Sequence, residues 1–154
     1  REDPDIILVG EMRDLETISL ALTCAELGIL VFGTLHTNSA AKTIDRIINA
    51  FPSEQQEQTR TMLSESLRAV IAQQLLRTVD GKRCAANEIL IGSPALASLI
   101  RSSKIAQINS LIQTGTSQGM QTMDQHLMEL VSKKIITTES AYEKAIDKNL
   151  FARR

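Results

Sequence analysis

The stretch Asp5–Asp14, DIILVGEMRD, decides the fold of this chain. Four apolar residues run from Ile6 to Val9 without a polar break, a pattern typical of a short strand buried on both faces of a parallel sheet. Gly10 and Glu11 follow directly. Ligands bind at the carboxyl ends of strands in open α/β sheets, so Glu11 stands where a carboxylate can orient an attacking water or act on a bound metal. The alternative interpretation is a solvated charge beside a strand.

A second apolar run favours the active-site interpretation because it also ends in polar side chains. Ile29–Phe32 leads directly into Gly33–Asn38, GTLHTN. Between the two runs, residues 15–27 have the apolar spacing of a helix, which Asp14 can cap and Gly28 can end. Strand, helix and strand make a βαβ unit with a right-handed crossover. Two neighbouring strands that both end in reactive side chains predict one active site.

The middle of the chain predicts two further helices and a hairpin. The first helix runs through Ala50, with Ile44, Ile47 and Ile48 facing inward. A capping box of the form S-x-x-Q at Ser53 predicts a second, long helix to about Gln74, with an inward stripe of Met62, Leu63, Leu67, Val70 and Ile71. Asp80-Gly81 is a hairpin turn signal, so strands over residues 74–78 and 86–91 are expected to add an antiparallel edge to the sheet.

The last third of the chain predicts helices only. We expect them over residues 94–101, 105–114 and 122–133, the third opened by a Thr122/Gln125 capping box, and a last one from Thr137 or Thr138 to near Lys148. A stripe of core residues should lie on this third helix and before it, and His126 is expected on its polar face; the stripe is Met120, Met123, Leu127, Leu130 and Val131. A boundary near Gly92 then separates a sheet-bearing domain, residues 1–92, from a helical one, residues 93–154.

Composition excludes several classes of protein. The chain has 154 residues, with 17 Lys and Arg against 18 Asp and Glu, no Trp, one Tyr and three Phe. Without a basic face or aromatics for base stacking, a nucleic-acid binder is not expected. Two separate cysteines, Cys24 and Cys84, argue against a disulfide framework or a zinc site and fit a reducing compartment. The longest apolar run, residues 27–33, is too short for a transmembrane segment.

The two polar boxes together resemble a known family. Val9–Asp14, VGEMRD, resembles the Walker B box of the secretion-superfamily (GspE/PilT-like) P-loop ATPases, and Gly33–Asn38 resembles their histidine box. At this spacing the pair is most similar to the type IV pilus retraction ATPases. The resemblance implies an α/β fold: the C-terminal part of a RecA-like ATPase core, with a mostly parallel sheet and a β-hairpin edge, followed by a small helical subdomain.

The same resemblance implies a motor. It implies ATP and Mg²⁺ as cofactors, a homo-hexamer, and hydrolysis that powers pilus retraction and twitching motility. The ring would be cytoplasmic and bacterial, peripheral at the inner face of the cytoplasmic membrane, acting on an inner-membrane pilus platform protein.

Residue roles follow from the match of the boxes. Glu11 would polarise the attacking water and support hydrated magnesium through water rather than as a direct ligand. His36 would contact a γ-phosphate oxygen or relay its presence to the neighbouring strand. Gly10, Arg13, Thr34 and Thr37 are candidates for the nucleotide site or a subunit interface. For Arg13 the alternative is a local salt bridge with Asp14 or Glu16, and for the two threonines it is a hydrogen bond within the loop.

A third match concerns residues 94–102, PALASLIRS. It resembles the retraction family's signature helix, AIRNLIRE, which is linked to retraction rather than to hydrolysis. Ala95, Leu99, Ile100 and Arg101 match, and Leu96 is conservative, whereas three polar or charged positions of the signature are replaced by Ala97, Ser98 and Ser102. The alternative is an ordinary amphipathic helix.

One expected motif does not occur in the sequence. A P-loop needs Gly-x-x-x-x-Gly-Lys followed by Ser or Thr, and the single Gly-Lys pair here, Gly81-Lys82, is followed by Arg83 and has Leu76 where the first glycine should be. We therefore expect a fragment whose P-loop lies upstream and which hydrolyses little ATP alone. Two alternatives remain. One is a pilus-extension or type II secretion ATPase, although those relatives usually carry a four-cysteine zinc motif; the other is a non-enzymatic scaffold.

Overall fold

The computed structural model describes residues 3–152, which fall into two compact units. Unit 1 comprises residues 3–37, 41–68 and 92–108, and unit 2 comprises residues 38–40, 69–91 and 109–152. These units do not coincide with a single division of the chain at Gly92, and a domain boundary there stays a prediction. No helix among residues 3–152 is both long enough and apolar enough to span a membrane.

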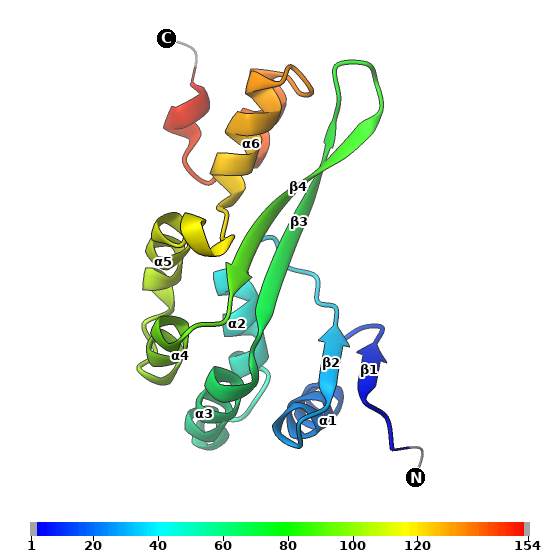
Figure 1. Cartoon of the computed structure of the whole chain (residues 1–154), viewed down its shortest axis with the longest axis vertical. Coiled ribbons are helices and arrows are strands. Elements are labelled where there is room, and N and C mark those ends of the chain that lie inside the picture. The colour runs from blue at the N-terminus through cyan, green and yellow to red at the C-terminus, as the bar shows by residue number, and fades with distance from the viewer. Residues whose placement is uncertain (1–2, 153–154) are drawn as a thin grey trace. The chain divides into compact units, whose positions relative to one another are not determined.

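Unit 1 begins with the predicted βαβ unit (Figure 1). β1 (Ile6–Val9) and β2 (Leu30–Gly33) are parallel neighbours, and α1 (Leu15–Glu26) connects them. Asp14 caps α1 by accepting a hydrogen bond from the Thr17 N–H at 2.9 Å. Gly28 follows the helix with a φ of +91°, in the left-handed region that glycine tolerates.

The prediction that these strands are buried on both faces is wrong for the described residues. One face of the sheet carries exposed side chains, namely Ile6, Leu8, Leu30 and Phe32, whose exposed fractions run from 44% to 75%. The pairs Ile6/Leu30 and Leu8/Phe32 lie side by side in the register, so the exposure is continuous. A strand is buried on both faces only when a layer covers each face, and in this part of the chain α1 packs against the sheet.

Three more helices complete unit 1: α2 (Ala40–Asn49), α3 (Gln56–Ser66) and α4 (Pro94–Arg101). The predicted inward stripe of α2 is confirmed, with Ile44, Ile47 and Ile48 at most 5% exposed. α3 packs against both α1 and α4, and Leu63, Leu96 and Ile100 are buried.

Two predictions for α3 are wrong. The capping box at Ser53 does not form, because a 3₁₀ turn over Ser53–Gln55 comes first and α3 starts without a side-chain cap. The helix also ends at Ser66 instead of near Gln74, since Leu67 is extended, with ψ 120°, and Ala69 starts a strand. Val70 and Ile71, which we assigned to a helical stripe, alternate between buried and exposed as strand residues do.

Unit 2 is built on a hairpin of β3 (Ala69–Arg77) and β4 (Arg83–Ile91), which pair antiparallel along their whole length (Figure 1). The predicted turn is present, and Gly81 has the positive φ, +83°, that it requires. The hairpin forms its own two-stranded sheet, however, and among the described residues it is not joined to β1 and β2. The expectation of one sheet with a hairpin edge is therefore wrong for this part of the chain.

Three helices follow the hairpin: α5 (Ile108–Thr114, whose first residue belongs to unit 1), α6 (Met123–Ser132) and α7 (Thr138–Lys144). Within unit 2, α6 packs against β4 and α7 packs against β3. Short 3₁₀ turns precede α5 (Ile105–Gln107, in unit 1), follow it (Thr116–Gln118) and follow α7 (Lys148–Phe151). The Thr122/Gln125 capping box is formed in full. A core cluster joins the hairpin to α6, α7 and the last turn, and its buried members are Leu76, Ala86, Met123, Leu127, Leu130, Ile136, Ala141, Ala145 and Phe151. The predicted methionine and leucine stripe is thus core, while α7 ends four residues before the predicted Lys148 because Ala145 is extended.

Candidate functional site

The two reactive side chains predicted from the strand ends lie together in unit 1. Glu11 follows β1 and His36 follows β2, and His36 Nε2 lies 3.4 Å from Glu11 Oε1. The backbone continues the strand pairing past the end of β1, since the Met12 N–H donates to the Thr34 carbonyl at 2.9 Å. The His36 side chain is 80% exposed and that of Glu11 is 47% exposed, so both are accessible to a ligand.

Short contacts hold the two strand ends in this arrangement. The Thr34 hydroxyl donates a hydrogen bond to the Gly10 carbonyl, which joins the segment after β2 to the segment after β1. Gly33 lies under the Met12 side chain, and a Cβ at Gly33 would come within 2.7 Å of the Met12 sulfur. A larger residue at position 33 would therefore displace Met12, the residue next to Glu11. For Thr34 the structure contains the local hydrogen bond that we considered as the alternative to a nucleotide contact.

Thr37 is engaged in the same way. Its hydroxyl lies 2.6 Å from the Thr43 hydroxyl on α2, and Thr43 is buried. This bond ties the residue after His36 to the first turn of α2. Its partner is a side chain of that helix, whereas the alternative that we considered for Thr37 was a hydrogen bond within the loop.

Arg13 and Asp14 complete the first box but do not pair with each other. Asp14 accepts hydrogen bonds from both the backbone N–H and the hydroxyl of Thr17, and these bonds hold the pKa of its carboxyl below the ordinary value of 3.8. Arg13 is exposed, and within residues 3–152 it forms no ion pair. The local salt bridge with Asp14 or Glu16, which we considered as the alternative for Arg13, is thus absent among residues 3–152.

The residues of the third match lie on α4. Ile100 is fully buried and Leu99 is half-buried, while Ala95 and Arg101 are exposed. Arg101 Nη1 donates a hydrogen bond to Ser64 Oγ at 3.2 Å, which links the end of α4 to α3. The apolar residues of this helix are therefore core, and the exposed ones are available for another role.

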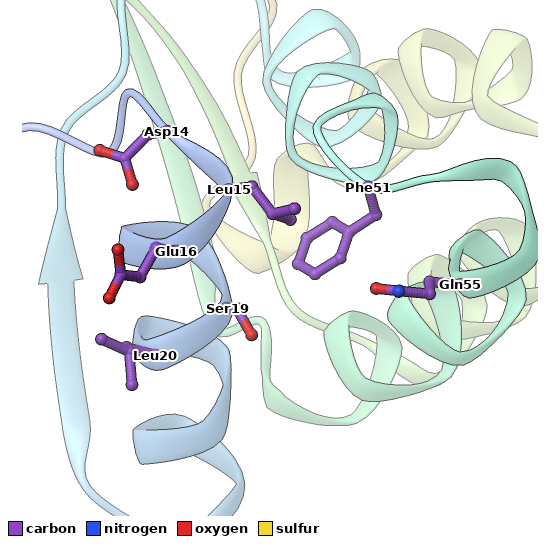
Figure 2. A pocket seen from close by; sticks show the side chains of 7 residues that line it. All are labelled: Asp14, Leu15, Glu16, Ser19, Leu20, Phe51 and Gln55. Atoms are coloured by element: carbon purple, nitrogen blue, oxygen red, sulfur yellow. The ribbon is translucent and has the colours of Figure 1, made fainter.

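Unit 1 also has a hollow of about 600 Å³. It is lined by the first half of α1 and by the segment before α3, and Leu15 and Phe51 point toward each other across it (Figure 2). Asp14 and Glu16 are on its α1 side, but neither Glu11 nor His36 lines it. The hollow is therefore separate from the Glu11/His36 pair.

Among residues 3–152 no three His, Cys, Asp or Glu side chains converge as metal ligands. Mg²⁺ commonly binds through one or two carboxylates together with waters and substrate phosphates, and Glu11 can supply one such carboxylate. Among the described residues Glu11 therefore offers one carboxylate and not a complete metal site.

Sequence reasoning missed Glu88. Its side chain is 2% exposed, and its two carboxylate oxygens accept hydrogen bonds from the Ala40 N–H at 2.8 Å and the Met123 N–H at 3.3 Å. A signal was present: Ala86, Glu88 and Leu90 alternate along β4, so a carboxylate occupies the apolar face of that strand. A charged residue in an apolar row is a departure that marks functional sites more often than others.

Comparison with known proteins identifies the same group of proteins as the two boxes. The family model described as "Type II/IV secretion system protein" matches residues 1–152. The type IV pilus retractation ATPase PilT of Pseudomonas aeruginosa is 63% identical over 145 residues, which are 94% of this chain and 42% of that protein. A twitching motility protein of Neisseria gonorrhoeae is 62% identical over 146 residues, covering 94% of this chain and 39% of that protein.

A solved structure agrees with the sequence comparisons. The crystal structure of the pilus retraction motor PilT with bound ADP matches 97% of this chain and 42% of that one, with a TM-score of 0.88 and 50% identity. This chain therefore spans about two fifths of the length of the relatives that it matches. Since the family model covers almost every residue, the chain belongs to the type II/IV secretion system protein family.

Proposed function

We propose that this chain is the part of a pilus retraction ATPase that carries its catalytic glutamate and histidine. In this proposal it forms the C-terminal part of a RecA-like core together with a helical subdomain. The observation that carries the proposal is the 3.4 Å approach of His36 Nε2 to Glu11 Oε1 at the ends of adjacent parallel strands. Ligands of open α/β sheets bind at that end, and the relatives named as retraction and twitching proteins match 94% of the chain.

Glu11 and His36 would divide the work of hydrolysis. Phosphoryl transfer to water requires positioning and charge neutralisation more than covalent chemistry. The Glu11 carboxylate would accept a hydrogen bond from the attacking water and hold it in line. His36 would donate from its ring to a γ-phosphate oxygen, and its 3.4 Å approach to Glu11 would link the two events. Bound Mg²⁺ would neutralise phosphate charge, with Glu11 in contact through water.

The proposed binding partners of the protein rest on the exposure of Arg13 and on the resemblance of the two boxes to the retraction ATPases. Arg13 is exposed beside the pair without an ion partner in the described chain, which suits a role toward the nucleotide or a neighbouring subunit in a homo-hexamer. The ring would lie at the cytoplasmic face of a bacterial inner membrane and act on the pilus platform protein. The chain alone, which has no P-loop motif in its sequence, would hydrolyse little ATP.

A pilus-extension or type II secretion ATPase is the second candidate. The two cysteines in the sequence cannot provide the four-cysteine zinc motif usual in that group, and within residues 3–152 no cluster of metal-ligating side chains occurs. A non-enzymatic scaffold is the third candidate, and it gives no reason for the Glu11/His36 approach.

The test is deletion of the gene for the complete protein, followed by complementation. Retraction predicts that the deletion strain keeps surface pili and loses twitching, and that the wild-type gene restores twitching while one carrying Glu11→Gln does not. Loss of pili on deletion would instead indicate extension. Restoration of twitching by the Glu11→Gln gene would remove the enzymatic role of Glu11.

A further inference from the structure

Thr34 is bonded to the chain on both sides of Glu11. Its hydroxyl donates to the carbonyl of Gly10, and its own carbonyl accepts a hydrogen bond from the Met12 N–H at 2.9 Å. All of these residues belong to unit 1. The backbone that carries the Glu11 side chain is therefore held at the residue before it and at the residue after it by the same threonine.

The strand pairing shifts by one residue at this point. In a parallel ladder the carbonyl of a bonded residue accepts the N–H of the residue that follows its partner on the other strand. The last pair of the sheet is Val9 and Gly33, so the uninterrupted pattern would bring the Glu11 N–H to the Thr34 carbonyl. The Met12 N–H occupies that place instead. One extra residue is thus accommodated after β1, which is the geometry of a β-bulge, a device that re-aims a side chain and is common beside active sites.

The Met12 side chain holds the bulge from a second direction. It packs on the backbone of Gly33, where an added Cβ would come within 2.7 Å of the Met12 sulfur. Gly33 and Thr34, two consecutive residues after the main run of β2, therefore contact both neighbours of Glu11. With its neighbours held, the Glu11 carboxylate lies 3.4 Å from His36 Nε2.

The bond from the Thr34 hydroxyl also decides between two roles for this residue. A hydroxyl has one O–H donor, and that of Thr34 is directed at the Gly10 carbonyl. Phosphate oxygens accept hydrogen bonds and so require a donor. The Thr34 hydroxyl cannot donate to Gly10 and to a nucleotide phosphate at the same time, and the bond to Gly10 favours a role in shaping the loop.

We propose that Thr34 is a positioning residue for Glu11. Its hydroxyl stabilises the bulge after β1, and the bulge sets the direction of the Glu11 carboxylate toward the attacking water and His36. The proposal rests on the proposed ATPase function. It makes the hydroxyl at position 34 a determinant of catalysis that acts through Glu11 and not through contact with the substrate.

Thr34→Val and Thr34→Ser in the complete protein test the proposal. Valine keeps the branched shape and removes the hydroxyl, whereas serine keeps the hydroxyl. Thr34→Val should lower kcat for ATP hydrolysis by about 10-fold or more, since misplacement of about 1 Å can cost a hundredfold. KM for ATP should change less than about two-fold, because no contact with the nucleotide is removed. Thr34→Ser should restore most of the lost kcat.

Thr23→Val is the matched control. Thr23 is an exposed threonine of α1, and its hydroxyl also donates to a backbone carbonyl, that of Ser19 at 2.9 Å. This substitution should leave kcat unchanged. An unchanged kcat in Thr34→Val would overturn the proposal, and so would a large rise in KM with kcat preserved, which would make Thr34 a nucleotide contact. Should Thr34→Val fail to assemble, Thr34→Ala removes the same hydroxyl and should give the same kinetic result.

A double-mutant cycle tests whether Thr34 acts through Glu11. If it does, adding Thr34→Val to Glu11→Gln should cause no further loss of kcat. An equal loss in both backgrounds would contradict the proposal, because the two side chains would then act independently.

Hydrogen exchange gives a readout that does not depend on activity. In complete protein carrying Thr34→Val, the Met12 amide should exchange about five-fold faster than in the wild type, the factor expected when one hydrogen bond of the segment is lost. Thr23→Val should leave the Met12 amide unaffected. Unchanged exchange at Met12 would overturn the proposal even if Glu11 is catalytic. If Glu11→Gln hydrolysed ATP normally, the proposed function would fail, and the exchange result would still show whether Thr34 holds this segment.

Discussion

Glu11 and His36 are exposed side chains that meet at 3.4 Å, and this determines what their substitution should do. Exposed ion pairs contribute little to stability because water screens them. Replacing either residue should therefore affect the reaction and leave the fold intact. Loss of activity in such a variant is then evidence for a chemical role.

His36→Ala in the complete protein should lower kcat by about 10-fold to 100-fold, the usual range for losing a group that aids proton transfer or holds phosphate charge. The thermal midpoint of unfolding should not change, since the ring is 80% exposed. Steady-state hydrolysis and a melting curve check both statements. An unchanged kcat would remove His36 from the site.

The second histidine is a natural control. His126 was expected on the polar face of α6; its Nδ1 accepts a hydrogen bond from the Asn87 N–H at 2.9 Å, and the residue is half-buried. His126→Ala should lower the free energy of unfolding by about 1 kcal/mol through the unpaired N–H, with kcat for the folded protein preserved. A large fall in kcat without destabilisation would be contrary to this assignment.

Asp14 makes a pH-dependent contribution to the stability of α1. Its pKa in the folded chain is lowered from 3.8 by the hydrogen bonds from the Thr17 N–H and hydroxyl. A lowered pKa means that the stabilisation is present in full above the unfolded value of about 3.8 and is lost as the pH falls through the folded value. Asp14→Asn should thus destabilise the protein at pH 7 more than at pH 3, as measured by circular dichroism during urea unfolding. An equal effect at both pH values would show that the charge is unimportant.

The proximity of Glu11 and His36 could be predicted from the sequence, because parallel strands end at the same sheet edge. The local partners could not be predicted in the same way. The bonds of Thr34 to Gly10 and of Thr37 to Thr43 depend on backbone positions that only the folded loops define. Glu88 was missed for a similar reason, since its donors, Ala40 and Met123, are far from it in sequence.

At the scale of elements, a local sequence pattern predicted the structure correctly where it fitted only one kind of element. The βαβ unit, α4, the Asp80-Gly81 turn and the capping box of α6 all agree with prediction. The segment after residue 66 failed because Leu67, Val70 and Ile71 fit a helical period as well as an alternating one. Pairing with β4 decides for the strand, and that partner lies on the other side of the turn.

The capping box of α6 offers a stability test at this scale. Thr122 is buried and its hydroxyl accepts a hydrogen bond from the Gln125 N–H at 3.1 Å, while the Gln125 side chain accepts one from the Thr122 N–H. Thr122→Ala should lower the free energy of unfolding by about 1 kcal/mol, the usual loss on removing an N-cap. Ser132→Ala, at the exposed end of the same helix, serves as the control in the same urea titration. If the two substitutions lowered the free energy of unfolding equally, the N-cap of α6 would not contribute to stability as predicted.

At the scale of the whole molecule, the proposed motor must turn hydrolysis into movement, and α4 is the element proposed to act in that step. Arg101 is exposed and donates a hydrogen bond to Ser64. It does not contact Glu11 or His36 through any ion pair or hydrogen bond of the described residues. Arg101→Ala in the complete protein should keep ATP hydrolysis within about two-fold, as expected for a surface substitution that leaves the active site unchanged, and should reduce twitching. Lys104→Ala, exposed three positions later, is the control and should affect neither. A parallel loss of hydrolysis would place Arg101 in the catalytic site instead.

The most direct measurement of the central claim is ATP hydrolysis and ATP binding by the complete protein carrying Glu11→Gln. The amide has nearly the shape of the carboxylate but cannot act as a base or hold the water in the same way. Turnover should fall by at least about 100-fold, as when a general base is lost, while the dissociation constant for ATP stays within a few-fold of the wild-type value. A variant that hydrolyses ATP at the wild-type rate would contradict the assignment of Glu11, and with it the reading of the two strand ends as an active site.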